Sequence, residues 1–176
     1  GGSLQPHLAD DRCRKIYSID PRPPQQPDDR SPGHIAHYED NSAERMLRML
    51  AATGYGDVAK IECFDSDASR VDQRRIVRRP QIAFIDGEHT KAAVMSDFQF
   101  CIKVVSKDGV VLFHDFPIIY PAILEICDWL SKEGHFGVPL RMEGNMFGIF
   151  LDPEVLATDP YLASLYKENR HFLAVF

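Results

Sequence analysis

Two short apolar runs, each followed by polar residues, constrain the fold of this chain most. The runs cover residues 82–85 and 110–113, and after them the chain carries four side chains that can bind ligands or protons: Asp86, His89, His114 and Asp115. Short apolar runs separated by a helical pattern are typical of strands in a parallel sheet that is buried on both faces. Because parallel strands end at one rim of their sheet, we expect these four side chains to lie close together.

Strand and helix patterns alternate along the rest of the chain. Strands are predicted at 15–19, 58–64, 81–85 and 110–113, with β-favouring residues in each. Two further strands, at 138–142 and 146–151, are joined by only three residues, which is too short for a crossover and predicts an antiparallel hairpin. This order predicts an α/β fold with a mostly parallel sheet, helices on both faces and a C-terminal antiparallel hairpin.

Helix signals lie between these strands. Asn41, with Glu44 three residues later, predicts a helix start, and Thr90 predicts another. Pro121 is expected as the first residue of the next helix. Helices are also expected at 4–11 and over most of 153–170.

Two polar segments do not fit the alternation. Residues 21–40 hold prolines at 21, 23, 24, 27 and 32, so we expect a long loop that can act as a lid. His34 and His37 in this loop are expected to be lid or surface residues. Residues 70–79 carry five arginines, which indicate a solvated helix surface or, alternatively, an anion-binding segment.

Composition excludes several classes of protein. The chain has 176 residues, 44% of them hydrophobic, which is enough for a single domain over 1–176 with a sizeable core. A net charge of −6 argues against nucleic acid as a partner. Apolar runs are far shorter than the roughly 20 residues of a membrane span, so no membrane partner is expected. The four scattered cysteines suggest buried, reduced thiols in a cytoplasmic protein.

The chain resembles class I S-adenosylmethionine-dependent methyltransferases, in the branch of macrolide-sugar O-methyltransferases and cephalosporin-hydroxylase-like proteins. The resemblance rests on six short motifs: GGS at 1–3, YSID at 17–20, DS at 65–66, FIDGEH at 84–89, LFHD at 112–115 and GN at 144–145. It implies a Rossmann-like fold. Two parts of that fold, the first strand and the start of the glycine loop, are absent from this sequence. We therefore expect either a longer natural chain or another segment or subunit that fills the gap in the sheet.

The resemblance also implies the cofactor site. It places Gly1, Gly2 and Ser3 against the methionine part of S-adenosyl-L-methionine. Asp20 corresponds to the acid that binds the ribose hydroxyls, as a carboxylate can accept two hydrogen bonds from a vicinal diol. Asp65 and Ser66 correspond to the turn beside the adenine, and Asp86 is also assigned to the cofactor site.

The resemblance also implies a divalent metal, Mg²⁺ or Mn²⁺, at the ends of the strands at 81–85 and 110–113. Its expected ligands are Asp86, His114 and Asp115. Because Mg²⁺ prefers oxygen ligands, His114 either shifts the preference towards Mn²⁺, Fe²⁺ or Zn²⁺ or does not bind the metal. His89 corresponds to the proposed general base, which takes the proton from a hydroxyl held in line with the methyl group. The implied activity is O-methylation of a small hydroxylated molecule, such as a sugar or a natural product.

Two other functions remain open from the sequence. A metal-dependent hydrolase could use Asp86, His89, His114 and Asp115 but would leave Asp20 and Asp65 without a role. A non-catalytic relative that binds a nucleoside or a protein partner is the other alternative. The apolar residues 172–176 suggest self-association into a homo-oligomer.

Overall fold

The computed structural model describes residues 2–27 and 33–169, and these form two compact units. Of the described residues, unit 1 comprises 2–27 and 35–78, and unit 2 comprises 33–34 and 79–169. Gly1 and the apolar residues 172–176, for which sequence predictions were made, lie outside the described residues. The interpretation of 1–176 as a single domain stays a prediction.

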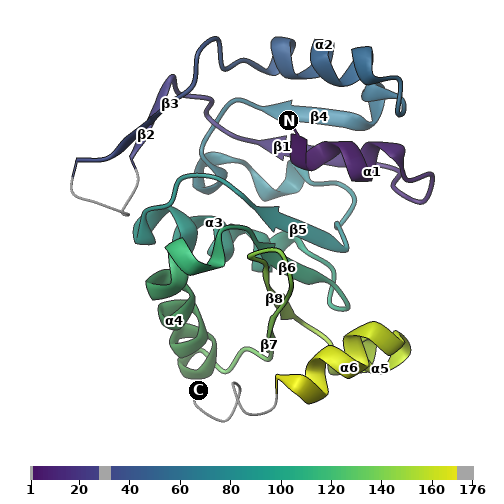
Figure 1. Cartoon of the computed structure of the whole chain (residues 1–176), viewed down its shortest axis with the longest axis vertical. Helices are drawn as coiled ribbons and strands as arrows, with labels where there is room; N and C mark the ends of the chain where they lie inside the picture. The colour runs from purple at the N-terminus through teal and green to yellow at the C-terminus, as the bar shows by residue number, and fades with distance from the viewer. Residues whose placement is uncertain (1, 28–32, 170–176) are drawn as a thin grey trace. The chain divides into compact units, whose positions relative to one another are not determined.

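Unit 1 is built on a parallel strand pair, β1 and β4 (Figure 1). Its elements are α1 (Gln5–Ala9), β1 (Ile16–Ile19), β2 (Gln25–Pro27), β3 (Ile35–His37), α2 (Ala43–Thr53) and β4 (Ile61–Phe64). Its core is formed by four buried side chains from α1, α2 and the two strands: Leu8, Ile16, Leu50 and Ile61. The strand pair confirms the predicted parallel arrangement of the segments at 15–19 and 58–64.

Unit 2 holds a four-stranded sheet in the order β5-β6-β8-β7. Its elements are β5 (Ile82–Ile85), α3 (Lys91–Val104), β6 (Val110–Phe113), α4 (Phe116–Lys132), β7 (Val138–Arg141), β8 (Phe147–Phe150), α5 (Pro153–Thr158) and α6 (Pro160–Glu168). Strands β5 and β6 are parallel, whereas β8 pairs antiparallel with both β6 and β7. The α/β architecture, the parallel pair and the C-terminal hairpin are therefore as predicted.

Helices cover both faces of this sheet (Figure 1). On one face, Phe147 and Ile149 of β8 pack with the buried sides of α3 and α4. On the other face, Leu140 and Phe150 pack against Leu156 and the neighbouring residues of α5 and α6. The alternation of side chains along β8 thus separates two hydrophobic cores, as the period-two geometry of a strand requires.

Five local predictions are corrected by the structure. The segment at 58–64 forms strand only from Ile61, after a 3-10 turn at Val58–Lys60. Residues 70–79 do not form an α-helix. The only helical elements there are two short 3-10 turns, Ala68–Arg70 and Gln73–Arg75. The proline-rich segment is not entirely irregular, because β2 and β3 form an antiparallel pair within it.

The fourth and fifth corrections concern helix starts. Helix α4 begins at Phe116 rather than at Pro121, which lies inside it. Helix α2 is capped by Ser42, whose side chain accepts a hydrogen bond from the Arg45 N–H, and not by Asn41. The cap predicted at Thr90 is confirmed, because its side chain accepts a hydrogen bond from the Ala93 N–H.

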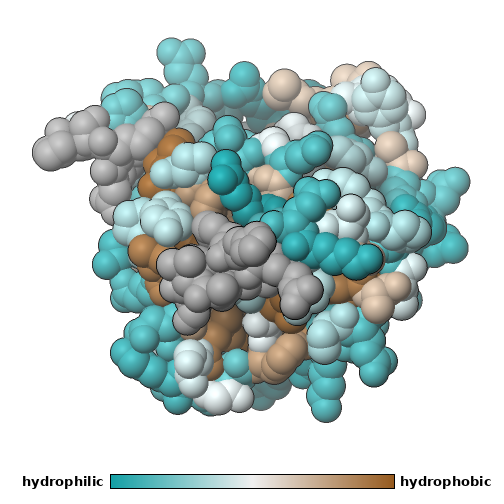
Figure 2. Space-filling view, turned by 60° about the horizontal axis from the view of Figure 1, so that its bottom comes forward, coloured by the Kyte–Doolittle hydropathy of each residue, from teal (hydrophilic) through white to brown (hydrophobic). Residues whose placement is uncertain are grey.

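The surface of the chain is largely polar on the face that Figure 2 draws. On the face drawn in Figure 2, hydrophilic side chains predominate and hydrophobic ones are interspersed among them. In the described ranges, no helix is long and apolar enough to cross a membrane.

The four cysteines are free and partly buried. Cys101 and Cys127 pack against the main core of unit 2, and burial raises the pKa of Cys101 to about 12 and that of Cys127 to about 11. The thiolate is the reactive species, so at pH 8 only about 10⁻⁴ to 10⁻³ of these thiols are in reactive form.

We therefore expect both thiols to be alkylated by iodoacetamide more than about 100-fold more slowly in the native chain than in urea at pH 8. The native rate should rise about tenfold per pH unit, because the thiolate fraction grows tenfold per unit below the pKa. Peptide mapping by mass spectrometry measures each site separately. Equal native and denatured rates at both sites would contradict this assignment.

Candidate active site

Three ligand atoms converge where β5 and β6 end. One ligand atom each from Asp86, His114 and Asp115 lies within 4.8 Å of the other two. Asp86 directly follows β5, and His114 directly follows β6. The His114 N–H donates to the Ile85 carbonyl at 3.0 Å, which adds one hydrogen bond beyond the last strand pair, Ile85 and Phe113. The parallel pairing thus brings together the predicted metal ligands.

His89 joins this cluster from the loop before α3. Its Nε2 lies 3.3 Å from Asp115 Oδ2, and its side chain is 19% exposed. The Thr90 cap sets the start of α3 directly after His89, and the Thr90 hydroxyl also donates to Glu88 Oε1 at 2.6 Å. These contacts fix the segment that carries the imidazole. All four residues predicted at this rim are therefore neighbours in the structure.

Asp115 has an unusual backbone for its position. Its φ is 52°, in the left-handed region that residues other than glycine adopt rarely. It is the N-cap residue of α4, yet its carboxylate makes no capping hydrogen bond. The carboxylate instead lies near His89 and His114, with Oδ2 3.3 Å and 3.2 Å from their nearest ring nitrogens. Such local strain is commonly found at functional sites.

The donor set fits a divalent cation. The Nδ1 atom of His114 is buried and forms no hydrogen bond with the described residues, although Asp86 Oδ1 and Asp115 Oδ2 both lie 3.2 Å away. The nitrogen and the two oxygens are therefore close together without hydrogen-bond geometry between them. One nitrogen and two oxygen ligands suit Mn²⁺, Fe²⁺ or Zn²⁺ better than Mg²⁺, which prefers oxygen ligands only.

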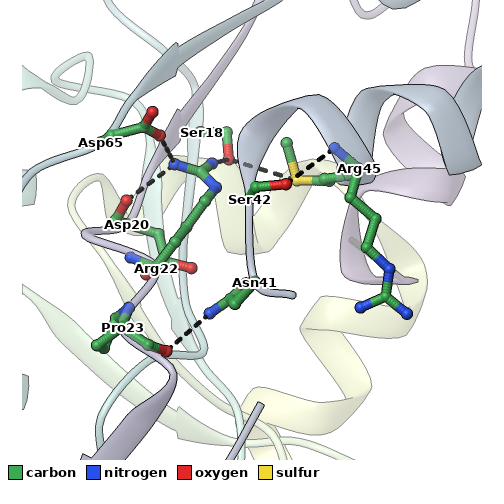
Figure 3. A network of polar contacts seen from close by, with 9 residues as sticks. Ser18, Asp20, Arg22, Pro23, Asn41, Ser42, Arg45 and Asp65 are labelled. Atoms are coloured by element: carbon green, nitrogen blue, oxygen red, sulfur yellow. Dashed lines mark hydrogen bonds and ion pairs between the residues drawn. The ribbon is translucent and has the colours of Figure 1, made fainter. Parts of the chain in front are cut away.

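A second polar group lies in unit 1, at the ends of β1 and β4 (Figure 3). Ile19 pairs with Phe64 in the last position of the ladder, so Asp20 and Asp65 follow adjacent strand ends. The guanidinium of Arg22 contacts both, through the backbone carbonyl of Asp20 at 2.8 Å and through Asp65 Oδ1. The two acids that the resemblance assigned to the nucleoside are thus joined by an arginine.

The predicted glycine-loop residues have a different setting. Gly2 and Ser3 belong to a 3-10 turn, Gly2–Leu4, and Gly1 lies outside the described residues. Gly2 lines a hollow of about 240 Å³ together with residues at the start and along one side of α2. Neither Asp20 nor Asp65 lines this hollow. Ser66 donates its hydroxyl hydrogen to the Asp67 carbonyl at 3.2 Å, within the turn after β4.

Two functional candidates escaped the sequence reading. Arg22 lies in the proline-rich segment and carries no periodic signal, yet its side chain is only 4% exposed. Asn41, predicted to cap a helix, instead donates to the Pro23 carbonyl at 3.2 Å and so holds the chain beside Arg22 (Figure 3). The one available signal for Arg22 was its position two residues after a strand-end acid, between two prolines.

The arginines of 70–79 are mostly held by neighbours. Arg74 pairs with Asp72 at 3.0 Å and Arg75 with Glu62 at 3.5 Å. The Arg75 guanidinium also lies 4.3 Å from the centre of the Phe64 ring. These contacts favour a structural surface over the alternative of an anion-binding segment.

Comparison with known proteins identifies the family. The profile of the family described as "Methyltransferase domain" matches residues 4–116, which include all the described candidate residues except Gly2 and Ser3. The chain therefore belongs to this family of methyltransferase domains. A search of curated proteins finds no match.

Solved structures show the same fold. The O-methyltransferase NovP is similar with a TM-score of 0.60 and 15% identity, over 85% of this chain and 64% of that chain. The calicheamicin methyltransferase CalS11 is similar with a TM-score of 0.54 and 13% identity, over 85% and 65% of the two chains. The sequence thus spans just under two thirds of the length of these structures, and the class I methyltransferase fold expected from the resemblance is confirmed.

Proposed function

We propose that this chain is the core of an S-adenosylmethionine-dependent O-methyltransferase that modifies a hydroxyl group of a small molecule with the assistance of a divalent cation. The observation that carries the proposal is the convergence of Asp86, His114 and Asp115, with His89 alongside. The similarity in fold to NovP and CalS11, whose names describe methyltransferases, supports the reaction class. A sugar or another hydroxylated natural product is the proposed acceptor class.

The residues of the cluster have distinct proposed roles. Asp86, His114 and Asp115 would hold the cation, which when bound would lower the pKa of an acceptor hydroxyl and orient it. His89 would accept the proton from that hydroxyl at Nε2. Asp115 Oδ2, 3.3 Å from this nitrogen, would stabilise the imidazolium that results.

The cofactor site is proposed in unit 1, at the ends of β1 and β4. S-adenosylmethionine would supply a methyl group already activated by its sulfonium leaving group. In the Asp20 carboxylate, Oδ1 accepts a hydrogen bond from the Arg22 backbone N–H, whereas Oδ2 accepts none from any described residue. That oxygen can accept hydrogen bonds from a ribose diol, and so the residues present fit the nucleoside part of the cofactor.

Calorimetric titration with S-adenosylhomocysteine, alone and with Mn²⁺ or Mg²⁺, tests this function. We expect micromolar binding of the nucleoside and separate binding of Mn²⁺ in preference to Mg²⁺. Asp86→Asn should weaken Mn²⁺ binding by more than about 100-fold, because even residues behind metal ligands contribute 10–100-fold to affinity.

Asp128→Asn is the matched control for Asp86→Asn. Asp128 is an exposed carboxylate of α4 that pairs with Lys132 at 2.6 Å, and its loss should leave Mn²⁺ affinity unchanged. Absence of nucleoside binding by the unaltered chain would reject the methyltransferase function. Equal Mn²⁺ affinity in the Asp86→Asn and Asp128→Asn chains would reject the cation site alone.

A further inference from the structure

The Arg22 side chain is the one buried charge of unit 1 among the described residues, and it lies where the proposed cofactor would bind. Arg22 as a whole is 7% exposed, whereas its ionic partner Asp65 is 64% exposed at the side chain. Its φ is 52°, although it is not a glycine and it precedes Pro23. Both features make this conformation unfavourable for the local sequence, so surrounding contacts must hold it.

Those contacts come from residues at the ends of β1 and β4 (Figure 3). Nη1 donates to the Asp20 carbonyl at 2.8 Å and to Asp65 Oδ1, and Nη2 donates to the Ser18 hydroxyl at 2.9 Å. The Arg22 backbone N–H donates to Asp20 Oδ1 at 2.7 Å. One residue therefore fixes both the backbone and the carboxylate of Asp20.

The charge of Arg22 also changes what this edge can bind. Two carboxylates on adjacent strand ends repel each other, and their mutual repulsion would turn them apart into solvent. The guanidinium contacts the Asp65 carboxylate and the Asp20 backbone carbonyl, and its positive charge balances the negative charge of this edge. Oδ1 of Asp20 is occupied by the Arg22 backbone N–H. Asp20 Oδ2 then remains in a fixed direction as an acceptor, with no described residue bonded to it.

We propose that Arg22 is the positioning residue for the nucleoside, and that it holds Asp20 in the orientation that accepts hydrogen bonds from the ribose diol. This inference rests on the proposed function and deepens it. The ligand class is an adenosine with free 2′- and 3′-hydroxyls, and the selectivity for the 2′-hydroxyl depends on Arg22 although Arg22 itself need not touch the ribose.

The test compares S-adenosylhomocysteine with its 2′-deoxy analogue by calorimetry. The unaltered chain should prefer the first by at least about tenfold, which is the contribution of one hydrogen bond to a charged group. Arg22→Met removes the guanidinium contacts that hold the Arg22 backbone in its strained conformation, and so releases the N–H that orients the Asp20 carboxylate. It should therefore weaken S-adenosylhomocysteine about tenfold and leave the Kd of the deoxy analogue within about twofold, which removes the preference. A general structural weakening would instead lower both affinities together.

Further variants separate this role from folding. Arg22→Lys keeps the charge but replaces the planar guanidinium, so it should give an intermediate preference. Asp20→Asn should remove the preference as Arg22→Met does, and the double variant should lose no more than either single one, because the two residues act as a unit. Arg12→Met is the control, since Arg12 is an exposed arginine of the same unit paired with Asp10.

Circular dichroism and thermal unfolding of each ligand-free variant check that it is folded. If Arg22→Met does not fold, the comparison of Arg22→Lys with the unaltered chain decides. A folded Arg22→Met or Arg22→Lys chain that keeps the full preference for the 2′-hydroxyl would overturn the inference while leaving the proposed function intact. An unaltered chain that binds neither compound would overturn both.

Discussion

Replacing His89 with glutamine is expected to lower the rate of methyl transfer by about 10²–10⁴-fold, the contribution typical of a general base. Glutamine keeps the approximate size and polarity of the side chain but cannot take up the hydroxyl proton. His89 Nε2, 3.3 Å from Asp115 Oδ2, is the proton acceptor of the proposed site. Transfer of radiolabelled methyl groups from S-adenosylmethionine to the best acceptor among a panel of hydroxylated sugars and phenols measures the effect.

His135→Gln is the matched control for this experiment. His135 is an exposed histidine of the same unit that follows α4 and stacks on Trp129, away from any acidic partner among the described residues. The control should keep its rate within about twofold, in the range of surface substitutions. The His89→Gln chain should still bind S-adenosylhomocysteine with unchanged affinity. A rate within threefold of the unaltered chain would show that His89 is not the base.

Replacing Phe98 with alanine is expected to destabilise unit 2 by about 3–5 kcal/mol, as is typical for a buried phenylalanine. Phe98 is fully buried, and its ring lies 6.0 Å from that of Phe113 and 5.9 Å, edge to face, from that of Trp129. The loss combines the transferred apolar surface, the cavity left behind and two aromatic contacts. It is a large fraction of the roughly 5–15 kcal/mol by which a domain is stable.

Urea unfolding followed by tryptophan fluorescence measures this loss. The chain contains a single tryptophan, Trp129, which lies in unit 2 and contacts Phe98, so the signal reports on that unit. Phe136→Ala is the control, because Phe136 is 58% exposed and its removal should change the free energy of unfolding by less than about 0.5 kcal/mol. A similar shift of the two midpoints would contradict the assignment of Phe98 to the core.

Some features of the site were predictable because they depend on residues close together in sequence. The apolar runs of β5 and β6 and the Thr90 cap of α3 follow from local patterns. Once two strands are parallel, their ends meet at one rim, and so the contact between Asp86 and His114 followed from the order of the elements. Asp20 and Asp65 were assigned to the cofactor site by the resemblance alone, and the β1–β4 register places them after neighbouring strand ends.

Other local predictions were wrong because distant contacts outweighed local preference. Asn41 was expected to cap α2, but its side chain bonds the Pro23 carbonyl, and Ser42 takes the capping position. Pro121 favours a helix start, yet α4 begins five residues earlier, where Phe116 and Ile119 pack into the core. Burial of those two side chains stabilises the extra turn by more than the proline disfavours it.

The sequence by itself therefore determined the α/β order, the strand ends and the four polar residues after β5 and β6. Only the tertiary structure decided that Asp115 turns its carboxylate towards His89 and His114 rather than capping α4, and that Arg22 is buried between Asp20 and Asp65. The physical reason is the same in both cases. Periodicity and capping are set by neighbours along the chain, whereas the stability of a strained backbone or a buried charge depends on partners that only the fold brings together.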